Sequence, residues 1–290
     1  MKNLSERILH KTIDEALEKT PCCRTVLNAF RPVLVERNRL IEESKLDAIA
    51  GLCPEEWESS RGVPLIRLQP LFSEGDPCRS IASSLIPAMQ EGFPDLSREL
   101  DKIKLDILGG RIRLHEYLRI YPDAEGVIVD EWAARSGVRD GALRFLLLNV
   151  ARILLTIRAK GIALGIRDAQ WDKGICPICG AFPMLSILRD KSQRWLHCSI
   201  CGHEWRFSRV VCPFCQRESP AGMNFFFLQD RKEESAFACE ECKRYVISVH
   251  QAIGLSDVDP DITAISLLHL DLMMQQRGFR PVAECAWNVL

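Results

Sequence analysis

Four copies of the pattern Cys-x-x-Cys lie within one stretch of the chain, residues 176–242. Their cysteines are Cys176, Cys179, Cys198, Cys201, Cys212, Cys215, Cys239 and Cys242. Two residues between two thiols let a tight turn, or knuckle, aim both sulfurs at one ion, and two knuckles supply the four thiolates of a tetrahedral site. The sequence therefore predicts two metal sites with these eight cysteines as ligands.

The identity of the two ions stays open, because four thiolates in tetrahedral geometry suit zinc and iron equally. With zinc the sites would be redox-inert; with iron they would resemble rubredoxin and could pass one electron. A closed four-thiolate site has no open coordination position, which argues against hydrolytic metal catalysis. We expect two ions, iron or zinc, and no enzymatic activity.

The cysteine region is an internal repeat, since Cys176 lies 36 residues before Cys212 and Cys198 lies 41 residues before Cys239. Each repeat is too short to bury a core alone, so metal binding would have to supply folding free energy. Sequential pairing places the first four cysteines at one ion and the last four at the other. Crossed pairing stays open, because the ten residues between Cys201 and Cys212 could also form a hairpin.

Apolar periodicity divides the chain into a helical part and a β part. Helical spacing predicts helices over residues 4–19, 22–45, 79–89, 95–108, 112–119, 127–135, 142–160 and 261–277. Among these, 142–160 has the longest apolar face and is expected to be central, and the Gly- and Pro-rich residues 51–78 read as a connection. Period-two patterns predict strands over residues 182–187, 193–197, 204–207, 208–211, 224–229 and 236–238.

These patterns predict an α plus small metal-binding β fold with three parts. Residues 1–168 form an all-α domain, and residues 169–252 form two tandem rubredoxin-like or zinc-ribbon-like modules, with sites over about 174–211 and 212–252. Residues 253–290 form a C-terminal helix and tail that pack on the body.

Charge and hydropathy exclude several classes of protein. The 38 Lys and Arg residues against 39 Asp and Glu argue against a generally basic nucleic-acid surface. The first 20 residues carry charges through any apolar core that a secretory signal would need, and Arg144, Arg152 and Arg158 interrupt the most apolar stretch. Thirteen cysteines without an export signal favour thiolate ligands in a reducing compartment. We expect a cytoplasmic protein without membrane insertion.

Several segments between residues 174 and 247 resemble the FdhE formate dehydrogenase accessory proteins. They are Cys176-Pro-Ile-Cys-Gly-Ala-Phe-Pro183, Arg194-Trp-Leu-His-Cys-Ser-Ile-Cys201, Glu204-Trp205, Arg209-Val-Val-Cys-Pro-Phe-Cys215 and Ala238-Cys-Glu-Glu-Cys-Lys-Arg-Tyr245. The resemblance implies a cytoplasmic maturation factor that contacts the catalytic subunit of a molybdenum or tungsten formate dehydrogenase. It also implies that the eight cysteines take part in rubredoxin-type iron binding and in contact with that subunit.

Two other functions compete with this one. A nucleic-acid-binding zinc-ribbon protein would need a basic face, whereas residues 171–251 carry 11 basic and 9 acidic side chains. A rubredoxin-like one-electron carrier would need iron at the knuckles. No nucleic-acid partner is expected, and the sequence is compatible with a homodimer.

Several side chains outside the knuckles have both a functional and a structural interpretation. Arg194, Trp195, His197, Glu204, Trp205 and Arg209 could form a partner-binding face, or the tryptophans could fill a small core. His203 could replace a thiolate, although four cysteines suffice. Phe225–Phe227 predicts a strand that exposes at least one ring. The other cysteines are expected to be small buried apolar residues rather than nucleophiles: Cys22, Cys23, Cys53, Cys78 and Cys285.

Overall fold

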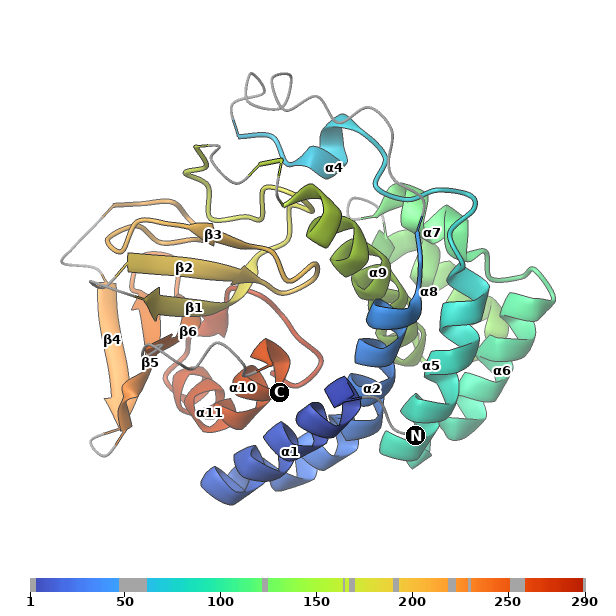
Figure 1. Cartoon of the computed structure of the whole chain (residues 1–290), viewed down its shortest axis with the longest axis horizontal. Helices are drawn as coiled ribbons and strands as arrows, with labels where there is room; N and C mark the ends of the chain where they lie inside the picture. Colours follow the sequence, from blue (N-terminus) through green and yellow to red (C-terminus); the bar gives the residue numbers. More distant parts are fainter. Residues whose placement is uncertain are drawn as a thin grey trace.

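The structure is a computed structural model of the chain, and it describes residues 4–46, 62–121, 125–163, 165–166, 170–189, 193–218, 223–228, 231–250 and 259–288. Helices from the first half of the sequence fill the right of Figure 1, and one β-sheet lies on the left. This arrangement confirms the expected fold class, a helical N-terminal region followed by a β region that carries the cysteine pairs.

The helical region confirms each helix expected before residue 165. Its helices are α1 (Leu4–Lys19), α2 (Arg24–Glu43), α4 (Leu65–Leu68), α5 (Cys78–Gly92), α6 (Ser97–Leu108), α7 (Leu114–Ile120), α8 (Glu125–Ser136) and α9 (Asp140–Ile162). The short helix α4 lies inside the stretch expected to be a connection, of which residues 51–61 fall outside the described residues. No helix in the described ranges is long and apolar enough to cross a membrane.

Helix α9 is the central helix of this region, as its long apolar face predicted. It contacts α2, α5, α6, α7 and α8, and thirteen of its residues are buried on all sides of the helix. Two of the thirteen are polar and both are bonded. The Asn149 amide donates to the Phe145 carbonyl (2.8 Å), and the Arg158 guanidinium pairs with Asp76 (2.6 Å).

The two cysteine repeats share one seven-stranded sheet. Its strands are β1 (Pro183–Arg189), β2 (Gln193–Cys198), β3 (Glu204–Arg206), β4 (Met223–Leu228), β5 (Arg231–Cys239), β6 (Arg244–His250) and β7 (Arg280–Pro281). The order is β3-β2-β1-β6-β5-β4, with β7 on β6. Each repeat contributes an antiparallel trio, and parallel pairing of β1 with β6 joins the trios, with Leu185 opposite Ile247. The second repeat therefore extends the sheet of the first.

Two predicted elements differ from the structure. The strand expected over residues 208–211 is wrong, because Ser208–Val210 are exposed and the carbonyls of Ser208 and Val211 accept bonds from the Arg194 side chain. The helix expected over residues 261–277 is broken at Leu267 into α10 (Pro260–Ser266) and α11 (Leu268–Gln276). The Ser266 hydroxyl bonds the Ile262 carbonyl (2.7 Å), a side-chain bond that competes with continuation of the helix.

The hydrophobic core is continuous across the expected domain borders, and the division at residues 168 and 252 stays a prediction. One buried cluster joins helices α2 and α5 to α9 with the first four cysteines. A second cluster joins α1 and α2 with strands β1, β5 and β6 and with α10 and α11. Arg37 on α2 and Arg152 on α9 both pair with the buried carboxylate of Asp261, which ties α10 to the helical region.

Candidate metal centres

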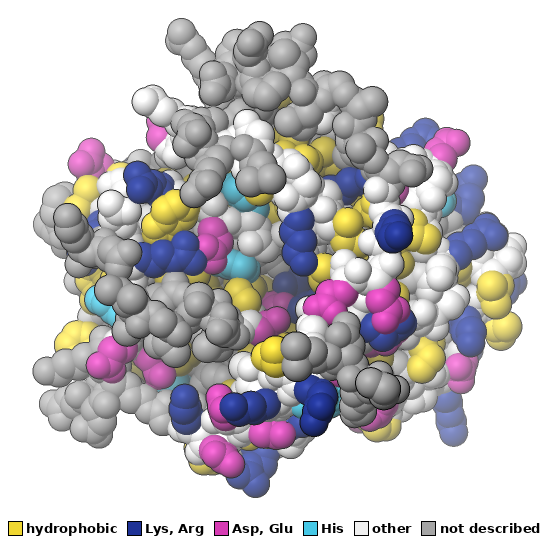
Figure 2. All heavy atoms as spheres, in the orientation of Figure 1, with side chains coloured by type: hydrophobic (Ala, Val, Ile, Leu, Met, Phe, Trp, Pro, Cys, Tyr) yellow, Lys and Arg dark blue, Asp and Glu magenta, His cyan; other side chains and the backbone are white. Residues whose placement is uncertain are grey.

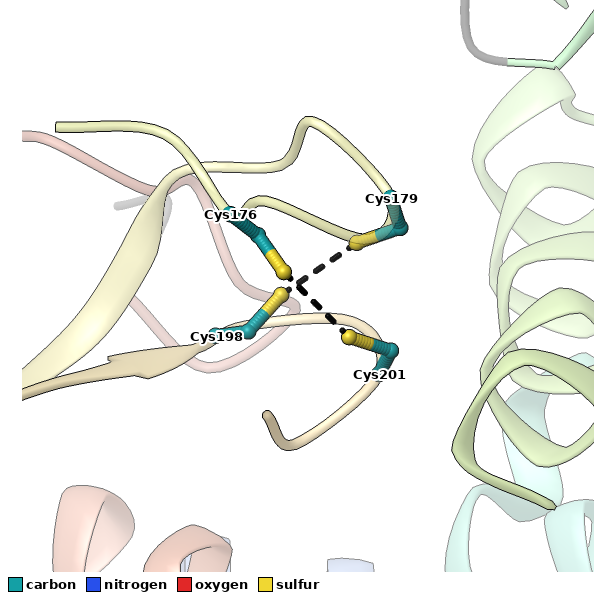
Figure 3. A group of neighbouring side chains, drawn as sticks. All are labelled: Cys176, Cys179, Cys198 and Cys201. Carbon is teal, nitrogen blue, oxygen red and sulfur yellow. Dashed lines mark hydrogen bonds between the residues drawn. The ribbon is translucent and has the colours of Figure 1, made fainter. Parts of the chain in front are cut away.

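The first cysteine site brings together the four thiols of Cys176, Cys179, Cys198 and Cys201, all of them buried. Figure 3 shows the four sulfurs converging from two turns of the chain. The Sγ atoms of Cys176 and Cys201 are 3.5 Å apart, and those of Cys179 and Cys198 are 3.4 Å apart. Helix α4 supports the first knuckle, since the Leu65 N–H donates to the Pro177 carbonyl (2.8 Å).

The second site repeats this arrangement with Cys212, Cys215, Cys239 and Cys242. Here the Sγ distances are 3.7 Å for Cys212 and Cys242 and 3.8 Å for Cys215 and Cys239. Cys212 and Cys239 are buried, whereas Cys215 and Cys242 are half-buried. The grouping is therefore sequential in both repeats, and the crossed pairing that the sequence left open is not found.

The spacing of the sulfurs fits a tetrahedral metal site. Metal–sulfur bonds of about 2.3 Å require sulfur–sulfur edges of roughly 3.8 Å, whereas a disulfide bond is about 2.05 Å long. In each group the four ligand atoms lie within 4.8 Å of one another. Each group could therefore hold one metal ion, and the choice between iron and zinc is not decided by this geometry.

The pKa shifts of the thiols also fit a metal ion in each group. Burial raises the pKa of Cys176 and Cys201, whereas Cys198, despite its burial, has its pKa held well below the usual 9.0 by bonds from the other three thiols. In the second site burial raises the pKa of Cys242 to about 11, while the Arg217 backbone N–H and neighbouring thiols outweigh burial and lower that of Cys215. Four adjacent thiolates would repel one another, and a bound cation would remove that conflict.

Every knuckle ends on a residue in the left-handed region. In the first site these residues are Gly180 (φ +75°) and Gly202 (φ +70°), and in the second they are Gln216 (φ +56°) and Lys243 (φ +55°). In this tight turn the N–H of the residue after the second cysteine can bond the carbonyl of the first cysteine. The Gly180 N–H donates to the Cys176 carbonyl in this way (3.0 Å). Glycine adopts this conformation without strain, whereas other residues do so at a cost.

The side chains proposed for a partner-binding face divide into buried and exposed groups. Trp205 is 4% exposed and its indole donates to the Lys173 carbonyl (3.0 Å), which supports its structural interpretation. Trp195 is half-buried between the guanidiniums of Arg189 and Arg206. Arg209 is exposed.

Glu204 binds two of its neighbours, accepting from the His197 ring (3.1 Å) and the Arg189 guanidinium (2.5 Å). His203 is not part of either four-thiol group, and burial lowers its pKa. The His197 ring therefore links strand β2 to strand β3, and neither histidine belongs to a four-thiol group.

The remaining described cysteines lie outside the two four-thiol groups. Cys23, Cys78 and Cys285 are buried as expected, whereas the expectation for Cys22 is wrong, because this residue is exposed in the short helical turn Pro21–Cys23. The Cys78 thiol lies 3.8 Å from the His115 ring, a contact that the sequence did not reveal. Burial raises the pKa of the Cys78 thiol to about 12, so this thiol is not a reactive thiolate. Cys53 lies outside the described residues.

Comparison with known proteins finds similarity to FdhE proteins. The family model described as "FdhE, central domain" matches residues 175–209, the segment that holds the first site. The protein FdhE homolog of Aquifex aeolicus (strain VF5) is 24% identical over 270 residues, which cover 90% of this chain and 88% of the relative. These matches support the resemblance to the FdhE family.

One other FdhE protein matches a shorter part of this chain, and another matches nearly all of it at lower sequence identity. Protein FdhE of Escherichia coli (strain K12) is 30% identical over 112 residues, or 36% of this chain and 34% of the relative. The crystal structure of the FdhE protein from Pseudomonas aeruginosa covers 98% of this chain and 96% of its own at 17% identity, with a TM-score of 0.59. The last comparison shows that this chain has the FdhE fold across its length.

Proposed function

We propose that this chain is an accessory factor that binds the catalytic subunit of a molybdenum- or tungsten-dependent formate dehydrogenase and supports its assembly into active enzyme. The observation that carries the proposal is the pair of four-thiol groups within a chain that resembles the FdhE family. We further propose that the eight cysteines of these groups ligate two metal ions and that the chain acts in the cytoplasm. No reaction of its own is proposed, because a closed four-thiolate site leaves no coordination position for a substrate.

Strand β4 is the candidate docking surface for the dehydrogenase subunit. It is an edge strand of the sheet, and Phe225 and Phe227 on one of its faces are 45% and 49% exposed. An edge strand offers backbone groups to an added strand, and exposed aromatic rings offer apolar contact area. The prediction that the Phe225–Phe227 run exposes at least one ring is confirmed by these two side chains.

Affinity purification of the tagged chain from its own cells tests the proposal. We expect the formate dehydrogenase catalytic subunit to copurify, and we expect cells that lack the gene to lose formate oxidation. The double substitution Phe225→Ser and Phe227→Ser should reduce copurification, whereas Val127→Ser, which alters a 77% exposed apolar side chain on α8, should not. Normal formate oxidation without the gene would contradict the proposed function.

Electron transfer is a second candidate function, because Cys215 and Cys242 of the second site are half-buried. A partly exposed iron site could exchange an electron with a partner, whereas zinc could not. Metal analysis and a visible absorption spectrum of aerobically purified protein distinguish the two; a colourless, zinc-only protein from iron-replete cells would exclude this function.

Nucleic acid is not proposed as a partner. Lys and Arg side chains intermix with Asp and Glu over the described part of the face in Figure 2. A protein whose affinity rests on phosphate contacts would need a more continuous basic surface. Titration with generic DNA and RNA at several salt concentrations tests this expectation.

A further inference from the structure

A surface cavity of about 650 Å³ lies where the first repeat meets the second. Arg194 and Arg206 reach it from β2 and β3 of the first repeat. Val211 and Gln216, which also line it, adjoin Cys212 and Cys215 of the second site. Its volume is in the range of small-molecule sites, about 300–1,000 Å³.

The cavity is strongly basic. Among the residues that the structure describes, four basic side chains line it, Lys173, Arg194, Arg206 and Arg209, against one acidic side chain, that of Asp172. In the ranges that the structure describes, no carboxylate pairs with any of the three guanidiniums. Elsewhere in the protein many arginines do have such partners, as Arg139 has in Glu99 (2.8 Å). The lining therefore carries positive charge that the described protein groups leave uncompensated.

Arg194 is a fixed part of this lining rather than a mobile surface side chain. It is 4% exposed, its Nε donates to the Ser186 hydroxyl (3.0 Å), and its Nη1 donates to the carbonyls of Ser208 and Val211 (both 3.3 Å). Its guanidinium lies over the Phe237 ring, 4.1 Å from the centroid. The buried Nη2 has no hydrogen-bond partner among the described residues. Strands β1 and β5 thus hold this buried cation in place at the cavity.

We propose that this cavity binds a small molecule that carries a phosphate group. A carboxylate would neutralise one of the excess charges, whereas a phosphate monoester carries a charge of roughly −2 and three acceptor oxygens. Guanidinium groups match phosphate oxygens in a two-bond geometry. Trp171 and Phe207 give the cavity an apolar wall for the remainder of the ligand. This site does not depend on the proposed partnership with a dehydrogenase.

Calorimetric titration of the full-length, metal-loaded protein with phenyl phosphate tests the proposal, with benzoate as the matched carboxylate on the same ring. We expect saturable binding of phenyl phosphate, at least about tenfold tighter than that of benzoate. The double substitution Arg206→Gln and Arg209→Gln should weaken it by at least about tenfold, as expected for lost charge-assisted bonds. Both side chains are exposed, so the variant should keep its fold, which circular dichroism checks.

Arg217→Gln is the control, because Arg217 is an exposed arginine beside the second site that does not line the cavity. Its affinity for phenyl phosphate should equal that of the unaltered protein. Equal weakening in the control and the double variant would overturn the proposal, as would the absence of binding. Tighter binding of benzoate, or of an acidic peptide such as polyglutamate, would overturn it in favour of a docking site for acidic protein segments.

Discussion

The first and second cysteine sites use the same four-thiol pattern in different surroundings. The first site is wholly buried and belongs to the large hydrophobic cluster that includes helices α5 to α9. The second site has two half-buried thiols and lies beside a small cluster of three buried residues, Phe237, Val246 and Val282. The comparison shows that the same ligand geometry occurs in one repeat within the core and in the other near the surface.

Loss of one thiol should have the largest effect and should separate the two sites. We expect Cys198→Ser to destabilise the whole chain, because structural metal sites contribute on the order of 10 kcal/mol and this site is continuous with the helical core. Cys242→Ser should lose one ion per chain but keep the helical content. Metal content by mass spectrometry, together with thermal unfolding followed by circular dichroism, measures both effects. Equal loss of helix in the two variants would show that the sites are equivalent in stability.

Breaking a buried ion pair of the helical core should destabilise the protein much more than breaking an exposed pair beside the second site. Asp261 pairs with Arg152 (2.8 Å), where both side chains are largely buried, and Arg152 lies on helix α9, which belongs to the same hydrophobic cluster as the first site. Asp261→Asn removes the carboxylate that pairs with two buried guanidiniums, so we expect a loss of about 3–5 kcal/mol in the free energy of unfolding. Urea denaturation measures it.

The control for this substitution lies beside the second site. Glu241 pairs with Arg217 (2.6 Å), and both side chains are largely exposed. Glu241→Gln should cost less than about 1 kcal/mol, because exposed pairs are screened by solvent. Costs of similar size for the two substitutions would contradict the difference in surroundings.

Metal release should be slower from the first site. A coloured chelator in excess must reach the sulfurs, and Cys215 and Cys242 are accessible whereas the thiols of the first site are not. We expect two phases of equal amplitude that differ at least about tenfold in rate, because exchange at the first site requires local opening of the core. The fast phase should be absent in Cys242→Ser. A single phase would mean that burial does not control release.

Local sequence signals predicted the cysteines of the two four-thiol groups and most helices and strands, whereas contacts between distant segments were missed. The knuckles and the helices before residue 165 follow from spacing and periodicity, which act within a few residues. Strand β6 and its parallel pairing with β1 unite segments about 60 residues apart, and no periodicity encodes that register. The pair of Arg37 with Asp261 spans 224 residues. The cavity lined by Arg194 likewise exists because the two repeats meet in one sheet.

The smallest expected difference concerns the residue after each knuckle, and it should have opposite signs at the two sites. Gly202→Ala places a side chain at φ +70°, and its Cβ would meet nothing nearer than His197 at 3.8 Å, so the cost is conformational and about 1 kcal/mol. Gln216→Gly removes the strain at φ +56° and should stabilise the protein by about 0.5 kcal/mol, since the flexibility that glycine adds to the unfolded chain offsets part of the gain. Denaturation of the metal-loaded proteins measures both changes. If Gln216→Gly destabilised the protein as much as Gly202→Ala, the left-handed turn would not be a source of strain at the second site.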